Sequence, residues 1–410
     1  MSFKKLSSTI CIIGAGPAGA ATSIFLSKKG IEHIIVDAAI FPRDKTCGDG
    51  LDLKSLRMLN HIDRDIIPNE LLNNEHFTVS SGVRFISNKG INTDFIYKQP
   101  KGQEDRFPFL VAKRFHFDNF LIGKIDRKTA DFRQGTKVKT IAKEGANWKL
   151  MAEDHEGEVE ITCQMLIGAD GDHSTVLRYL GDRKINRKHY FSTVRQYWKN
   201  IDGIHEKNLL EVYSPANIPM SYFWIFPLAN GEANVGYGMT SEFASKRNIN
   251  IRESFKELIA KDPALAYRFK NAEPCQEIFG CGIPAASLKR KVVGDGWLLV
   301  GDAASIASPT TAEGIGTGMM TGYIAARFIE KALKEKSFSE TTLVNYSREI
   351  FRRMEGEISK YNFFLRFPNA YSYIANNLIG DNFFCHYYVN KQFSQWMETC
   401  YDKEVIVNVD

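Results

Sequence analysis

The stretch Gly14-Ala15-Gly16-Pro17-Ala18-Gly19 decides the fold, because its three glycines have the GxGxxG spacing. Residues 8–13 before it predict a short buried strand, residues 17–29 after it predict a helix, and residues 33–37 predict a second strand. In such a unit the first glycine allows a tight turn and the second lets the backbone approach a pyrophosphate. The third lets helix and strand pack closely. The pattern predicts an α/β fold with a parallel sheet.

The residues around this loop predict a dinucleotide site. The N-terminus of the helix that begins near Pro17 presents free N–H groups and a partial positive charge to phosphates. Asp37 follows about 20 residues after the first glycine, where a carboxylate accepts hydrogen bonds from ribose hydroxyls. The alternative is a glycine-rich turn with Asp37 as a helix cap. The loop alone does not separate FAD from NAD.

Composition places the chain among ordinary globular proteins. It has 410 residues, of which 44% are hydrophobic and 25% charged, and its length predicts two or three domains. A net charge of +5 without charged blocks gives little support for nucleic-acid binding. Seven cysteines without a CxxC pair argue against a disulfide scaffold or a zinc ribbon, so we expect no metal and a reducing cytosol.

The N-terminal region imitates a signal peptide, because Lys4 and Lys5 precede an apolar stretch at residues 10–26. The regular glycine spacing inside that stretch serves a phosphate loop and not secretion. No window offers about 20 uninterrupted apolar residues for a transmembrane helix. We therefore expect a cytoplasmic protein.

Two later segments carry a resemblance to known flavoproteins. Residues 168–174 (Gly-Ala-Asp-Gly-Asp-His-Ser) and 301–304 (Gly-Asp-Ala-Ala) each follow a buried strand. Both resemble the later fingerprints of the flavoprotein group that includes the aromatic-ring hydroxylases. The resemblance implies FAD as cofactor, with Asp302 at its ribityl or ribose part, Arg114 near its phosphates and the backbone of Val138 beside its adenine.

Three further segments narrow the resemblance. They are residues 41–50 (Phe-Pro-Arg-Asp-Lys-Thr-Cys-Gly-Asp-Gly), residues 222–227 (Tyr-Phe-Trp-Ile-Phe-Pro) with 233–236 (Ala-Asn-Val-Gly), and residues 309–316 (Pro-Thr-Thr-Ala-Glu-Gly-Ile-Gly). Together they resemble the geranylgeranyl reductase family, FAD enzymes that saturate isolated double bonds in polyprenyl chains. The likeness covers residues 8 to 345. Asp37 stands where glutamate is commoner, and Ala312 where glycine is frequent, so we expect a slightly tighter loop there.

The resemblance implies two contacts around the reacting flavin ring. Gly314, Ile315 and Gly316 would place backbone amides and a helix N-terminus beside it, where they stabilise the negative charge of the reduced ring. The alternative is a helix start with an ordinary cap. Arg43, Cys47 and Gly48 are the other implied cofactor contacts.

Cys47 is the candidate catalytic residue. Arg43 and Lys45 are its neighbours in sequence, and nearby positive charge favours a thiolate. In the reductases that this chain resembles, the matching cysteine faces the substrate side of the flavin and is thought to assist proton delivery. Such a thiol could act as the acid of alkene reduction. The alternative is a small buried loop residue.

Tyr222, Trp224 and Phe226 alternate, so they share one face of a strand. With Pro309 they are our candidate substrate pocket, and an aromatic core layer between sheet and helix is the alternative. The basic run at residues 289–291 predicts a solvated turn, with contact to anionic lipid headgroups as the alternative.

The predicted fold class is α/β, a Rossmann-like FAD-binding domain with an inserted α+β substrate domain and a helical C-terminal segment. We assign residues 1–72, 105–180 and 280–345 to the FAD-binding domain. Residues 73–104 and 181–279 form the predicted substrate-binding domain, and residues 346–410 the C-terminal helical segment.

The predicted function is an FAD-dependent reductase that saturates carbon–carbon double bonds of an isoprenoid or polyprenyl lipid. With one dinucleotide fingerprint present, an external donor such as NAD(P)H or a reduced partner protein would reduce the flavin. An apolar substrate is compatible with peripheral contact with the inner face of the membrane. The aromatic residues 361–388 could supply that contact, and an ordinary helical core is the alternative, because the stretch has no strong basic amphipathic pattern. The alternatives are an FAD monooxygenase or halogenase on the same scaffold and a non-catalytic protein that binds FAD or lipid.

Overall fold

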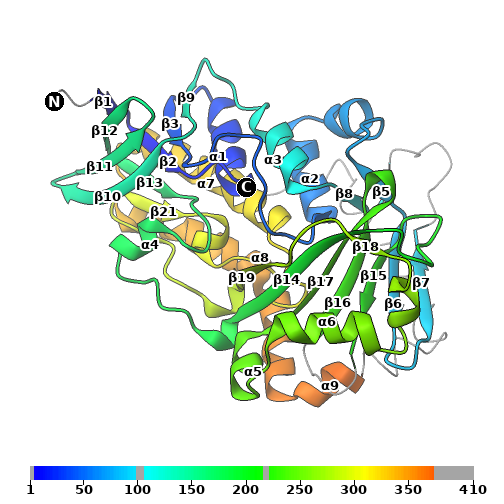
Figure 1. The fold of residues 1–410 in the computed structure, drawn as a ribbon. Helices are drawn as coiled ribbons and strands as arrows, with labels where there is room; N and C mark the ends of the chain where they lie inside the picture. The colour runs from blue at the N-terminus through cyan, green and yellow to red at the C-terminus, as the bar shows by residue number, and fades with distance from the viewer. Residues whose placement is uncertain (1–3, 98–105, 216–220, 374–410) are drawn as a thin grey trace. The chain divides into compact units, whose positions relative to one another are not determined.

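A computed structural model describes residues 4–97, 106–215 and 221–373 (Figure 1). The chain forms two compact units. Of the described residues, 4–44, 115–189 and 283–361 form the first, and 45–97, 106–114, 190–215, 221–282 and 362–373 form the second. The second unit is therefore interleaved with the first along the sequence.

The division differs from the predicted domain boundaries at five places. Residues 45–72, 106–114 and 280–282 lie in the second unit, and residues 181–189 and 346–361 lie in the first. The physical reason for the first two is strand pairing. β4 (Gly50–Leu51) and β5 (Thr78–Ser80) both pair with β8 (Phe109–Val111), which joins these segments into one three-stranded sheet. Short strands that pair across long loops give no local sequence signal.

The first unit is built on a six-stranded sheet in the order β20-β21-β13-β2-β3-β9. Its strands are β2 (Ile10–Ile13), β3 (His33–Val36), β9 (Ala130–Arg133), β13 (Met165–Gly168), β20 (Val293–Gly294) and β21 (Trp297–Leu299). All neighbours are parallel except the β20–β21 pair. The central strands β2, β3 and β13 are buried throughout, as a parallel sheet covered on both faces requires. The predicted parallel sheet is confirmed.

Helix α1 (Pro17–Ser27) packs against helix α7 (Ile315–Lys334) at very close range. A β-carbon at Gly322 would lie 2.7 Å from the backbone oxygen of Ala18. One at Gly301, in the short helix η6 (Gly301–Ala304), would lie 2.7 Å from the Ala18 β-carbon, and one at Gly318 would lie 3.4 Å from it. The glycines of η6 and α7 thus let both elements approach α1. Three segments that are distant in sequence therefore lie together.

The rest of the first unit contains a second sheet and several helices. The sheet has the order β1-β12-β11-β10 and contacts the six-stranded sheet through β11 and β13. Its strands are β1 (Lys4–Ser7), β10 (Lys137–Glu144), β11 (Asn147–Asp154) and β12 (Gly157–Cys163). The helices are α3 (Arg114–Ile122), α4 (Thr175–Tyr179) and α8 (Glu340–Arg366), with the short turns η2 (Arg187–His189) and η5 (Ala286–Leu288).

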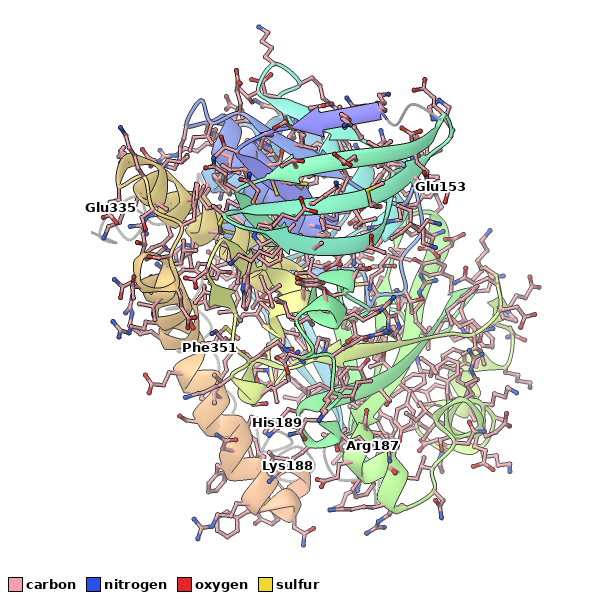
Figure 2. All side chains as sticks on the ribbon, turned by 90° about the vertical axis from the view of Figure 1, so that its left-hand side faces the viewer. Glu153, Arg187, Lys188, His189, Glu335 and Phe351 are labelled. Atoms are coloured by element: carbon pink, nitrogen blue, oxygen red, sulfur yellow. The ribbon has the colours of Figure 1, made fainter. Side chains whose placement is uncertain are left out.

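The predicted C-terminal helical segment is confirmed as far as the structure describes it. Helix α8 is followed by α9 (Pro368–Tyr373), and residues 374–410 lie outside the described part, as does most of the aromatic stretch 361–388. Figure 2 shows η2, labelled by Arg187 to His189, beside α8. There the Tyr361 hydroxyl donates to the Lys188 carbonyl at 2.7 Å. Across the described residues, no helix combines the length and the apolarity that a bilayer-spanning segment requires.

The second unit is built on a largely antiparallel sheet in the order β18-β14-β17-β16-β15-β6-β7, with β19 paired to β14. Its strands are β6 (Gly82–Ile86), β7 (Asn92–Ile96), β14 (Tyr190–Lys199), β15 (Leu210–Tyr213), β16 (Ser221–Pro227), β17 (Glu232–Thr240), β18 (Glu273–Pro274) and β19 (Phe279–Pro284). Helices α2 (Leu53–Ile62), α5 (Ser241–Lys246) and α6 (Ile251–Lys261) complete it, with the shorter turns η1 (Ile66–Leu71), η3 (Ala229–Gly231) and η4 (Ala266–Phe269). α6 crosses the strands in Figure 1.

The two faces of this sheet have different neighbours. Phe223 and Val235 belong to the hydrophobic core beneath α6, where the Phe223 ring stacks on Phe255 at 5.7 Å. Because side chains alternate along a strand, Tyr222, Trp224 and Phe226 lie on the opposite face. The aromatic side chains that we singled out therefore do not form the core layer between the sheet and α6.

The close approach of α1 and α7 predicts that Gly322→Ala will destabilise the first unit by about 1–3 kcal/mol, because the new methyl group meets backbone atoms that cannot yield. Thermal unfolding followed by circular dichroism measures this. Gly356→Ala is the matched control, because Gly356 lies exposed in α8 with no atom within 4 Å of the added carbon. There the change should stabilise the helix by about 1 kcal/mol. Equal shifts of the same sign in both variants would contradict the packing argument.

Candidate active site

The glycine loop in the first unit leaves no room for side chains at two positions. Gly14 has a φ of 102°, and a β-carbon there would lie 2.3 Å from the backbone oxygen of Ala169. A β-carbon at Gly19 would lie 1.9 Å from the Gly14 oxygen. The Gly14 N–H donates to the Val36 carbonyl at 2.8 Å, which ties the loop to the end of β3. Only glycine fits at both positions, as the fingerprint requires.

Asp37 fastens the glycine loop from the end of β3. One carboxylate oxygen accepts from the Ala15 N–H at 2.7 Å, and the other accepts from the Ala39 N–H at 2.8 Å. The carboxylate therefore caps a loop and not a helix, so the helix-cap alternative is wrong. Each oxygen keeps a second lone pair, and the ribose contact stays a prediction.

The start of α1 fits a pyrophosphate. Gly16 at the helix N-cap carries no side chain, Pro17 follows, and the first turn contains no acidic residue. A β-carbon at Gly16 would lie 3.7 Å from Nη2 of Arg43, so a guanidinium reaches the loop. Arg43 is held there by Asp118 of α3, with 2.8 Å between Nη1 and Oδ2. Unblocked amides beside an oriented cation suit the phosphates of a dinucleotide.

Two of the segments that resemble flavoproteins, residues 301–304 and residues 309–316, lie next to each other in this unit. A β-carbon at Gly314 would lie 3.5 Å from Oδ1 of Asp302, so the carboxylate faces the N-terminus of α7. The Gly316 N–H, however, donates to the Glu313 carboxylate at 2.6 Å. The Glu313 carboxylate thus engages one of the amides that we assigned to the flavin. The flavin contact of Gly314, Ile315 and Gly316 stays a prediction.

Two other predicted contacts have well-defined places in the first unit. Val138 is buried in β10, opposite Ala152 and next to a bulge between Val138 and Thr140. Pro309 is buried in the turn before α7, where the Ser308 hydroxyl accepts from the Thr311 N–H at 3.2 Å. Both assignments, to the adenine and to the substrate, stay predictions.

Ala312 explains why glycine is frequent at this position in the resembling reductases. Its φ is 58°, in the left-handed region that costs a residue with a side chain about 1–2 kcal/mol. The departure that we noted in the sequence is thus a strained backbone in the loop that leads into α7.

Ala312→Gly should therefore raise the unfolding temperature, with a net gain of up to about 1 kcal/mol after the larger unfolded-state entropy of glycine is subtracted. Differential scanning calorimetry measures the shift. Ala142→Gly, at an exposed position of β10, is the control and should cost about 0.5–1 kcal/mol. A loss of stability in both variants would show that Ala312 is unstrained.

In the second unit the Cys47 loop lies against the aromatic strand face. β-Carbons at Gly48 and Gly50 would each lie 3.5 Å from the Phe226 ring, and the one at Gly48 would lie 3.6 Å from Nε1 of Trp224. Trp224 in turn lies 5.5 Å from Tyr222 and 6.3 Å from Phe226, between ring centroids. Two segments that we selected separately are therefore neighbours within one unit.

The Asn234 side chain joins this loop to the sheet. Its amide nitrogen donates to the Cys47 carbonyl at 2.8 Å and to Oδ2 of Asp49 at 2.7 Å. Its oxygen accepts from Nε1 of Trp224 at 2.9 Å. A β-carbon at Gly236, opposite Trp224 on β17, would lie 2.0 Å from the indole ring, so glycine is required for the ring to lie there.

Asp49 is fully buried beneath the loop. Besides Asn234, its carboxylate accepts from the Tyr197 hydroxyl at 2.6 Å and from the Arg114 N–H at 3.3 Å. Burial raises the pKa of Asp49 to about 6, against the opposing effects of Arg195, Tyr197, Asn234 and Arg114. The carboxyl therefore changes charge near neutral pH.

Cys47 is half-buried, and desolvation raises the pKa of its thiol. Arg114, which hydrogen bonds to the cysteine side chain, opposes this, while the Asp49 charge adds to it. Burial therefore disfavours the thiolate that we expected, and Arg114 is the cation that acts on the sulfur. The sequence neighbours Arg43 and Lys45 are not among the groups that shift the pKa of Cys47.

Sequence reasoning missed the polar residues beneath the loop: Asp49, Arg195, Tyr197 and Asn234. Asp49 and Asn234 stand inside the segments that carried the resemblance, and Asn234 is a polar residue in an otherwise apolar strand. That position was a usable signal. Arg195 and Tyr197 offered none, because only the pairing of β14 with β17 brings them there.

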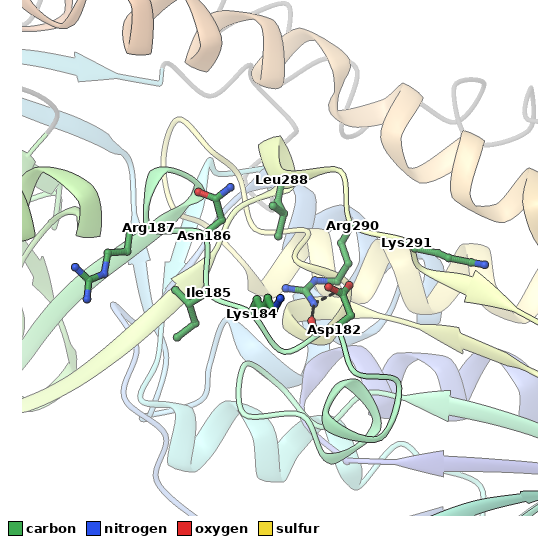
Figure 3. Close-up of a pocket in the computed structure, with 8 residues that line it drawn as sticks. All are labelled: Asp182, Lys184, Ile185, Asn186, Arg187, Leu288, Arg290 and Lys291. Atoms are coloured by element: carbon green, nitrogen blue, oxygen red, sulfur yellow. Dashed lines mark hydrogen bonds and ion pairs between the residues drawn. The ribbon is translucent and has the colours of Figure 1, made fainter.

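The basic run at residues 289–291 is only partly the solvated turn that we predicted. Lys289 is exposed, but Arg290 donates to the Ser305 hydroxyl at 3.0 Å and pairs with Asp182, and Lys291 pairs with Glu340 at 2.7 Å. Figure 3 shows Arg290 directed at Asp182 in a cavity of about 570 Å³. Arg290 thus connects the segments that contain Asp182 and Ser305 within the first unit.

Comparison with known proteins agrees with this geometry. Residues 7–356 match the family described as FAD binding domain, and the chain belongs to that family. It is an FAD-dependent oxidoreductase.

Its relatives include proteins named as reductases. The chain is 28% identical over 330 residues to a menaquinone reductase of Mycobacterium tuberculosis, covering 79% of this chain and 77% of that protein. It is 28% identical over 347 residues to a digeranylgeranylglycerophospholipid reductase of Methanocaldococcus jannaschii, covering 83% and 81%. The resemblance that we drew from the sequence is confirmed.

Solved structures share the fold. A geranylgeranyl bacteriochlorophyll reductase-like protein of Thermoplasma acidophilum matches with a TM-score of 0.80 at 20% identity, covering 97% of both chains. A flavin-dependent brominase matches with a TM-score of 0.75 at 18% identity, covering 97% of this chain and 94% of the brominase.

Proposed function

We propose that this protein saturates carbon–carbon double bonds of an isoprenoid or polyprenyl lipid, with FAD as the cofactor. The observation that carries the proposal is the packing of the Cys47 loop on the face that bears Tyr222, Trp224 and Phe226. A protonated thiol beside a row of aromatic rings suits an apolar alkene that has to be protonated. The names of the relatives, reductases of menaquinone and of a digeranylgeranyl lipid, support the same substrate class.

Each group has a separate role in the proposed reduction. When bound, reduced FAD supplies a hydride to one carbon of the double bond. The Cys47 thiol gives its proton to the other carbon, and desolvation keeps that thiol protonated until it is used. Tyr222 and Phe226, both half-buried, offer apolar surface to the chain of the lipid, and Trp224 is fixed by Asn234. An external donor, NAD(P)H or a reduced partner protein, would supply the electrons that re-reduce the flavin.

The proposal predicts that a polyprenyl lipid will reoxidise the flavin. The protein is reduced anaerobically, and a geranylgeranyl lipid or menaquinone is added while flavin absorbance is followed. We expect reoxidation together with a product that is heavier by two hydrogens for each bond reduced, detected by mass spectrometry of the lipid.

Two controls separate this reaction from others. A saturated phytanyl lipid offers no bond to reduce and should leave the flavin reduced. Menadione, a quinone without a prenyl tail, identifies oxidation by the quinone ring alone. Unchanged polyprenyl tails with every lipid would refute the proposed reduction.

Cys47→Ala should lower the rate of flavin reoxidation by at least about 10²-fold, because a positioned acid contributes about 10²–10⁴-fold. The flavin content should stay unchanged, since the substitution leaves the glycine loop and Arg43, which face the predicted phosphate site, unaltered. Cys275→Ala, at an exposed cysteine, is the matched control and should react at the original rate. A Cys47→Ala variant of full activity would remove the thiol from the mechanism.

The similarity in fold to a flavin-dependent brominase leaves one alternative function, that of an FAD monooxygenase or halogenase. Residues 222–227 do not have the Trp-x-Trp-x-Ile-Pro pattern of such halogenases. Oxygen uptake in step with an oxygenated or halogenated product would favour the rival over the reductase.

A further inference from the structure

The polar groups beneath the Cys47 loop form a cluster that the proposed reaction does not use directly. They are Asp49, Arg114, Arg195, Tyr197 and Asn234, and all five are buried. We propose that Asp49 is a positioning residue that holds the loop on the sheet and keeps the Cys47 thiol protonated. This inference rests on the proposed function only where it makes that thiol the proton source.

The geometry of Asn234 fixes the loop through Asp49. Trp224 Nε1 can only donate, so the oxygen of the Asn234 amide has to face it. The amide nitrogen is thereby directed at the loop, where it donates both to the Cys47 carbonyl and to the Asp49 carboxylate. Loss of either acceptor would leave a buried donor without its full set of partners.

Donors from three elements converge on the Asp49 carboxylate. They are the Tyr197 hydroxyl on β14, the Asn234 amide on β17 and the backbone N–H of Arg114 at the start of α3. Asp49 itself has a φ of 64°, a conformation that aspartate tolerates better than most residues. The carboxylate is thus the common acceptor that fixes a strained loop against two strands.

The charges around the thiol explain why the acceptor has to be an acid. Arg114 hydrogen bonds to the Cys47 side chain and favours its thiolate, and Arg195 lies 4.1 Å above the Tyr197 ring and donates to the Lys45 carbonyl. Asp49 is the carboxylate that acts against Arg114 on the sulfur. Without its charge no carboxylate would oppose Arg114, so the pKa of the thiol would fall and a larger fraction of it would be thiolate, which cannot give a proton.

The pH dependence follows from the burial of Asp49. Its pKa of about 6 means that the carboxyl is neutral in mild acid and ionised at neutral pH. The ionised form opposes loss of the Cys47 proton, and the neutral form does not. The two groups titrate as a coupled pair, so the pH profile of Cys47 should bend near the pKa of Asp49.

The experiment measures the reactivity of Cys47 in the FAD-loaded full-length protein. Wild-type protein and the Asp49→Asn variant are treated briefly with iodoacetamide over a range of pH, and the Cys47 peptide is quantified by mass spectrometry. We expect alkylation at neutral pH to rise about tenfold in Asp49→Asn, which corresponds to a pKa lower by about one unit. An unchanged profile would overturn the proposal.

The Tyr197→Phe variant distinguishes the effect of the Asp49 charge from the effect of a more mobile Cys47 loop. It removes one hydrogen bond to Asp49 but keeps the carboxylate, so alkylation at neutral pH should stay near the wild-type value. The bend in the profile should move to higher pH, since the lost donor stabilised the ionised carboxylate. A tenfold rise in both variants would show that the loop had merely loosened. If Asp49→Asn does not fold, an unmoved bend in Tyr197→Phe overturns the proposal by itself.

Cys275 provides an internal reference in every sample, because it is exposed and Asp49 is not among the groups that shift its pKa. Its alkylation should be the same in all three proteins. The measurement needs no substrate. A shifted Cys47 profile in a protein that reduces no polyprenyl lipid would therefore refute the proposed function and leave the role of Asp49 intact.

Discussion

The first unit depends on how closely other backbones approach helix α1. At its start, Gly14 and Gly19 have no space for a side chain. Along its length, Ala18 lies against Gly301 and Gly318, and Gly322 approaches the backbone of Ala18 and Thr22. Interiors are close-packed, so a methyl group added at Gly14, Gly19, Gly301 or Gly322 would overlap neighbouring atoms, which would have to shift. The closeness brings the glycine loop, the Asp302 segment and the N-terminus of α7 to one helix.

The second unit achieves a similar convergence by hydrogen bonds. Asn234 links a strand, an indole ring and the Cys47 loop through three hydrogen bonds of 2.7–2.9 Å. Burying a carboxylate is costly unless it is hydrogen bonded and faces opposite charge. Asp49 has both, with three donors and the Arg114 and Arg195 guanidiniums near it. A network of this kind specifies one arrangement of the loop more sharply than apolar packing would.

The sequence predicts those parts of the structure whose signals are local. The strand, glycine loop and helix at residues 10–27 follow from spacing and apolar runs, and the shared face of Tyr222, Trp224 and Phe226 follows from alternation. The environment of Cys47 could not be predicted, because it depends on the register between β14, β16 and β17 and on residues far away in the chain. Arg43 and Lys45 suggested a thiolate only because they are the nearest positive charges in sequence.

The two units place opposite demands on charge. A site for phosphates requires positive potential, which the start of α1 and Arg43 supply without a first-turn acid. A thiol that gives up a proton requires the reverse, because a cation beside it stabilises the thiolate. Arg114 is such a cation, and it hydrogen bonds to Cys47. A buried acid next to the sulfur resolves the conflict, since its negative charge restores the thiol while its hydrogen bonds hold the loop. An asparagine at position 49 would keep much of the hydrogen bonding and lose the charge, so the chemistry requires aspartate where packing alone would not.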